Sequence, residues 1–187
     1  MVLAAFEPFG GRRENQSERV VRELAAAPPR AVEVDVHILP VTFARLPGAV
    51  RALVAQPAHA LVIVGEASGA RGLRLERLAV NLIDARIADN AGARPVDRPV
   101  LRDAPVALFS TAPVKRLAAV ARRKGCAVEL SMSAGTFACN ASYYLALSWA
   151  RVPVLFVHVP ARLPAPRRHL IAVALGAVIG AFAKGKD

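Results

Sequence analysis

The chain has 187 residues, of which 55% are apolar and 21% charged, so an intrinsically disordered or collagen-like protein is excluded. Its length predicts one domain, spanning residues 1–187. The 25 lysines and arginines exceed the 14 acidic residues and give a formal net charge of +11. The cations are scattered, however, and aromatic residues make up only 5%, a pattern that favours a solvated basic surface over a nucleic-acid partner.

Cysteine content and apolar runs indicate where the protein works. The two cysteines, Cys126 and Cys139, are too few for a disulfide-stapled secreted scaffold. The first residues show no charged leader, and the longest apolar run, residues 170–182, is shorter than the roughly 18 residues of a membrane span. We therefore expect a cytoplasmic protein without a membrane partner. No zinc-ligand spacing or phosphate-binding loop is recognisable, so we expect no metal or cofactor.

Short apolar runs alternate with helical patterns along the chain. This alternation predicts a single three-layer α/β/α domain with a mixed, mostly parallel central sheet flanked by helices. In chain order, the pattern predicts a strand over residues 2–5, a helix over 17–26 capped by Ser17, a strand over 32–39, a helix over 46–55 and a strand over 60–64.

Residues 65–105 differ from the rest of the chain, because glycines and prolines recur there among many charges. We expect this segment to be mostly loop, and long loops inside compact domains are usually functional. The remaining elements predicted are a helix over 111–124 capped by Ser110 or Thr111, a strand over 128–132, a helix over 140–150, a strand over 153–158 and a helix over 165–184.

Chemically active residues follow several of the predicted strands. Because binding sites in open α/β sheets form beyond the carboxyl ends of the strands, we expect these residues to converge. Cys139 lies near the predicted start of a helix, where unpaired N–H groups and the helix dipole favour an anion and would lower the pKa of the thiol. His158, on a strand end, is the candidate base for such a nucleophile. From the residues alone, a buried structural cysteine and a core histidine remain the commoner interpretation.

Several short motifs occur in one order along the chain. They are Phe-Glu-Pro-Phe-Gly-Gly at residues 6–11 followed by Asn15 and Ser17, Gly-Glu-Ala at 65–67, Glu-Arg-Leu-Ala-Val-Asn at 76–81, Asp-Ala-Arg-Ile at 84–87, Gly-Thr-Phe at 135–137 with Cys139 and Asn140, and His-Val-Pro at 158–160. In these residues, from Phe6 to about Pro160, the chain resembles the type I pyroglutamyl peptidases, also called pyrrolidone-carboxylate peptidases.

The resemblance implies a cysteine peptidase that releases N-terminal pyroglutamate from peptides through a thioester, without a metal or cofactor. It implies a catalytic triad of Cys139, His158 and Glu76, and a homotetrameric assembly. It further implies substrate-binding roles for six residues: Phe6, Phe9, Phe137 and Ala138 lining the lactam pocket, Glu66 at its rim and Arg86 nearby. Such a pocket should be apolar and aromatic, because pyroglutamate carries no charge.

Two alternatives remain open at this stage. The chain departs from the family pattern at Ser68, Gly69 and Ala70, where the family usually has Gly-Gly-Arg, and the stretch between Cys139 and His158 is short. A homologue with an altered pocket could therefore hydrolyse another acyl or amide substrate through the same three residues. The second alternative is a non-enzymatic module that binds acidic partners through its basic surface.

Overall fold

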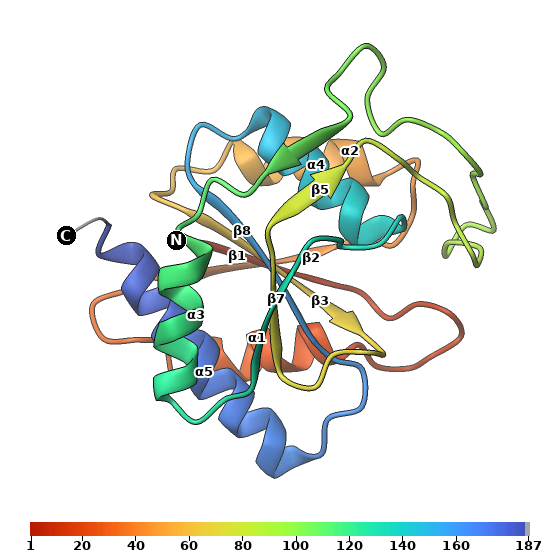
Figure 1. Ribbon diagram of the computed structural model, residues 1–187. Helices are drawn as coiled ribbons and strands as arrows, with labels where there is room; N and C mark the ends of the chain where they lie inside the picture. Colours follow the sequence, from red (N-terminus) through yellow and green to blue (C-terminus); the bar gives the residue numbers. More distant parts are fainter. Residues whose placement is uncertain (186–187) are drawn as a thin grey trace.

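A mixed sheet forms the centre of the protein (Figure 1). The computed structural model describes residues 1–185, and within them this sheet has six strands in the order β2-β1-β3-β8-β4-β7. All neighbouring strands are parallel except β8 and β4, which are antiparallel. The strands are β1 (Val2–Phe6), β2 (Asp35–Leu39), β3 (Leu61–Ala67), β4 (Leu73–Glu76), β7 (Val128–Ser131) and β8 (Val154–Pro160); β5 (Leu78–Val80) and β6 (Ala107–Phe109) form a separate antiparallel pair.

Helices cover both faces of the sheet, which confirms the predicted three-layer fold (Figure 1). One face packs against α1 (Gln16–Ala26), α3 (Val114–Arg123) and α5 (Ala165–Ala183), and the other against α2 (Leu46–Val54) and α4 (Ala138–Trp149). The central strands β1, β3 and β8 are buried on both sides, which explains their continuous apolar sequences. Residues 186 and 187 of the predicted domain lie outside the described residues.

Helix α5 is long and apolar enough to span a membrane by length and composition. Its side chains Ile171, Leu175, Val178 and Ile179 are nevertheless buried against the sheet and the neighbouring helices α1 and α3. The helix therefore contributes a large share of the core on this face. The expected absence of a membrane partner stays a prediction.

On the face of the sheet covered by α1, α3 and α5, two predicted helix starts are wrong. The N-cap of α1 is Asn15, whose side chain accepts a hydrogen bond from the backbone N–H of Ser17 (2.9 Å), while the Ser17 hydroxyl accepts one from the N–H of Phe6. Helix α3 begins at Val114 rather than near residue 111, because the Thr111 hydroxyl accepts a hydrogen bond from Val154 N (2.8 Å) and ties this segment to β8. In both places a hydroxyl group that was predicted to cap a helix accepts a hydrogen bond from a strand N–H instead.

The expectation of a loop over residues 65–105 is also partly wrong. Strand β3 continues to Ala67, and β4 and β5 lie inside the segment. The sequence Leu-Arg-Leu-Glu of β4 is short and half charged, so it did not stand out, although Leu73 and Leu75 are fully buried between β8 and β7. This strand matters because it ends on Glu76.

Asn140 joins helix α4 to strand β5 and provides a test of the fold. Its buried side chain accepts from Val80 N and donates to the carbonyls of Val80 and Leu82, each at 2.9 Å. Asn140→Ala leaves these backbone groups unpaired, so we expect the free energy of unfolding in urea to fall by about 2–4 kcal/mol. Ser148→Ala, which removes an exposed hydroxyl from the same helix, is the control and should cost less than about 0.5 kcal/mol. Equal losses for both variants would contradict this account.

Candidate active site

Cys139 and His158 meet over a glycine. Helix α4 begins at Ala138, two residues before the predicted start, so Cys139 lies in its first turn, and β8 continues past His158 to Pro160 rather than ending on it. Gly65 of β3 is in register with His158, and a Cβ on Gly65 would stand 2.9 Å from Cys139 Sγ and 3.0 Å from His158 Cδ2. The two side chains therefore lie within about 6 Å of each other, and only glycine at residue 65 allows this approach.

Glu76 holds the histidine from the opposite side. Its Oε1 lies 2.8 Å from His158 Nδ1, and both residues are buried, at 0% and 4% exposure. The pair exists because β4 is antiparallel to β8, with Glu76 opposite Phe156, two residues from His158. Nδ1 is engaged with the carboxylate, which leaves Nε2, next to Cδ2 in the ring, as the nitrogen on the Cys139 side.

The predicted lowering of the Cys139 pKa is wrong for the resting thiol. Burial, and after it the negative charge of Glu76, raise the pKa of Cys139 to about 12, although the backbone N–H of Cys139 acts in the opposite direction. A thiolate beside a carboxylate is costly unless a proton moves to a neighbouring base. A pKa this high keeps the Cys139 thiol protonated near pH 7.

A narrow aromatic recess opens beside Cys139. Phe6, Phe9, Phe137 and Ala138 line it together with Glu66, and the substrate-binding roles that the resemblance implies for these residues stay predictions. The centres of the Phe9 and Phe137 rings are 6.0 Å apart, and the Phe43 and Phe137 rings pack edge to face with their centres at 5.2 Å. The recess has about 10 Å³ of free volume, the space of about one water molecule, and the rings of Phe9 and Phe137 beside it are partly exposed.

Glu66 lines the recess, but its carboxylate is buried behind the wall and adds no polar surface to it. Its Oε2 accepts a hydrogen bond from Gln16 N at 2.8 Å, and its Oε1 forms an ion pair with Arg12. The Glu66 side chain is only 2% exposed. The resemblance implies a position for Glu66 at the rim of the pocket, where its backbone contacts the ligand, but not this charge pairing.

An open cleft of about 570 Å³ adjoins the recess and shares Phe9, Glu66, Phe137 and Cys139 with it. His158 also lines the cleft, and so do Arg86, Asp84 and the segment 133–137. Arg86 is exposed, and within residues 1–185 its side chain makes no hydrogen bond or ion pair that would fix it near the thiol. The predicted role of Arg86 in substrate binding therefore stays a prediction.

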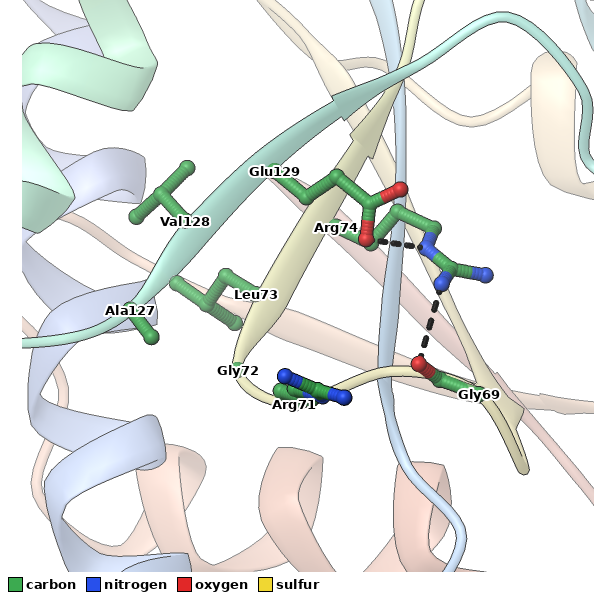
Figure 2. A pocket seen from close by; sticks show the side chains of 8 residues that line it. All are labelled: Gly69, Arg71, Gly72, Leu73, Arg74, Ala127, Val128 and Glu129. Atoms are coloured by element: carbon green, nitrogen blue, oxygen red, sulfur yellow. Dashed lines mark hydrogen bonds and ion pairs between the residues drawn. The ribbon is translucent and has the colours of Figure 1, made fainter.

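The loop that departs from the family pattern is held firmly in place. Figure 2 shows Arg74 of β4 reaching the Gly69 carbonyl (3.1 Å) and the Glu129 carboxylate of β7 (3.0 Å) beside a small cavity. Gly69 and Arg74 also line the cleft, so this contact shapes the wall facing Cys139. Within residues 1–185, no group of three or more His, Cys, Asp or Glu residues could hold a metal ion.

Sequence reasoning missed three residues of the site, which are Gly65, Phe43 and Arg12. Gly65 directly follows the predicted strand over residues 60–64, and a glycine there signals close packing. Phe43 and Arg12 give no comparable signal, since their contacts depend on how the loops after β2 and β1 fold.

Comparisons with known proteins identify the family of the chain. The family described as pyroglutamyl peptidase matches residues 1–166. The pyrrolidone-carboxylate peptidase of Clavibacter michiganensis is 39% identical over 97% of this chain and 91% of the relative, and that of Erwinia tasmaniensis is 40% identical over 86% and 77%. The crystal structure of the pyrrolidone carboxyl peptidase from Thermus thermophilus superimposes with a TM-score of 0.88 at 32% identity, covering 96% of this chain and 98% of that one. The chain therefore belongs to the pyroglutamyl peptidase family.

Proposed function

We propose that the protein is a cysteine peptidase that removes N-terminal pyroglutamate from peptides, with Cys139 as nucleophile, His158 as general base and Glu76 as the residue that orients it. The observation that carries this proposal is the succession of Glu76, His158 and Cys139 in space. Cys139, at the end of this succession, lines both an aromatic recess and an open cleft. The recess suits the lactam ring, and the cleft suits the rest of the peptide.

In the first half of the reaction, His158 Nε2 takes the proton of the Cys139 thiol as Sγ attacks the pyroglutamyl carbonyl carbon. Because the pKa of the thiol is raised by burial, attack and proton transfer occur together. Glu76 stabilises the imidazolium that forms. The imidazolium then gives its proton to the leaving amine, the C–N bond breaks, and a thioester remains on Cys139.

In the second half, water enters from the cleft and attacks the thioester, with His158 accepting one of its protons. The C–S bond breaks, the thiol regains a proton and pyroglutamate leaves. Unpaired backbone N–H groups in the first turn of α4 are available to hold the oxyanion in both halves. Arg86 at the cleft mouth adds positive charge on the same side.

We also propose that the protein acts in the cytoplasm as a homo-oligomer, without a cofactor. Both cysteines are free thiols, which suits a reducing compartment. Val106, just before β6, is 87% exposed, and Phe109, within β6, is 63% exposed. Such apolar surface suits an interface between copies of the chain.

A pyroglutamyl-coumarin amide assayed under reductant tests the function. We expect release of the fluorophore by the native chain and none above background by Cys139→Ala. Cys126→Ala is the matched control, because Cys126 is buried on the opposite face of the sheet, and it should retain activity within about twofold. A native protein no faster than Cys139→Ala would overturn the proposal in favour of another acyl or amide substrate, which prolyl, glutaminyl and acyl amides would identify.

Glu76→Gln tests the orienting role of the carboxylate. The amide cannot stabilise the imidazolium, so we expect kcat to fall by about 10³–10⁴-fold. Asp35→Asn removes an exposed carboxylate that also pairs with a histidine, His37 of β2, and should change kcat by less than about threefold. Similar activity in both variants would show that Glu76 has no part in catalysis.

Alkylation by iodoacetamide tests how the thiol is activated, since only thiolate reacts. We use a Cys126→Ala background and add His158→Ala. Without the base, the raised pKa leaves Cys139 neutral at pH 7, and its rate should climb about tenfold per pH unit through pH 10, as the thiolate fraction grows. With His158 present, the rate at pH 7 should be faster. A plateau below pH 8 in the variant would show instead that the helix terminus alone ionises the thiol.

A further inference from the structure

The carboxylate of Glu66 conflicts with the kind of ligand that the recess receives. Under the proposed function, on which this inference rests, the ring that enters is uncharged. Glu66 nevertheless places a carboxylate, with its side chain only 2% exposed, behind the apolar wall of the recess. Because little water screens it there, an unpaired carboxylate would attract a cation in the recess and would repel the lactam carbonyl.

Arg12 answers this conflict. It comes from the loop between β1 and α1, pairs through Nη2 with Glu66 Oε1, and places its guanidinium carbon 5.0 Å from the centre of the Phe9 ring. Its side chain is 41% exposed and lines the cleft, not the recess, so its charge remains hydrated while it neutralises the buried carboxylate. Arg12 therefore contacts both the Glu66 carboxylate and the ring of Phe9, which lines the recess.

We propose that Arg12 is a specificity-determining residue, whose pairing with Glu66 makes the recess accept a neutral pyroglutamyl ring and reject a cationic prolyl ring. Both are five-membered rings that differ by one exocyclic oxygen, so contact with the phenylalanine walls separates them only weakly. They differ in a carbonyl and in charge, since an N-terminal prolyl amine is protonated at neutral pH. Unpaired Glu66 would favour that ammonium, whereas Glu66 paired with Arg12 gives it no such advantage.

A purely structural role for Arg12, bracing the loop and Phe9, makes a different prediction. Loss of the brace would weaken the binding of both ligands equally. Loss of charge neutralisation would instead change the ratio of their dissociation constants. The ratio of dissociation constants for pyroglutamamide and prolinamide therefore separates the two roles. Pyroglutamamide contains the bond that the proposed reaction cleaves, so every chain in this comparison, including the one otherwise native, also carries Cys139→Ala. Calorimetry at pH 6.5, where prolinamide is protonated, then measures the ratio without turnover.

The experiment compares the native chain with Arg12→Ala, Arg12→Lys, Glu66→Gln and the double variant Arg12→Ala/Glu66→Gln. We expect Arg12→Ala to reduce the preference for pyroglutamamide at least about tenfold, and Arg12→Lys to restore most of it. The double variant should also recover the preference, although the brace is missing, because no carboxylate remains. Arg13→Ala, which removes the adjacent exposed charge of the same loop, is the matched control and should leave the ratio unchanged.

An unchanged ratio in Arg12→Ala, or a double variant as unselective as Arg12→Ala, would overturn the inference. Failure of the native chain to bind pyroglutamamide more tightly than prolinamide would do the same. The coumarin assay reports on the proposed function separately, because a chain that selects pyroglutamamide but releases no fluorophore would refute the hydrolysis and leave the role of Arg12 standing.

Discussion

The hydrogen bond between His158 Nδ1 and Glu76 Oε1 constrains both the sheet and the site. The Glu76 carboxylate has 0% exposure and needs a hydrogen-bond partner to offset its loss of water. The imidazole of His158 is that partner. That pairing requires β4 to run against β8, so that Glu76 comes within two residues of the position opposite His158. The single antiparallel pair among the described neighbours of the central sheet is thus what brings the Glu76 carboxylate to His158.

Much of this architecture could be predicted because burial leaves a direct trace in the sequence. The continuous apolar runs of β1, β3 and β8 locate the sheet centre, and the polar residues after them locate the site. Strand β4 left no such trace, since its buried positions, Leu73 and Leu75, alternate with charges over only four residues. The residue linked to His158 was identified by resemblance to a family, and not by any local pattern.

The prediction of a lowered pKa for Cys139 is wrong for a physical reason. A helix N-terminus offers a modest stabilisation of a nearby anion, of the order of 1 kcal/mol, whereas withdrawing a thiolate from water costs more. Sequence shows the helix start but not the depth of burial or the approach of Glu76. Both become visible only when β3, β8 and α4 are packed around Gly65, where they outweigh the helix terminus.

Two buried carboxylates belong to the site, and they have different partners. Glu76 lies against an imidazole, whose charge appears only when a proton arrives, so under the proposed function this pair can follow the reaction. Glu66 is paired with a guanidinium, whose planar fork suits a lasting ion pair with a carboxylate. Under the proposed function, a lasting ion pair suits a pocket that receives an uncharged ring, whereas a titratable partner suits the path of the proton. An exchange of the two partners would leave Cys139 without a proton acceptor.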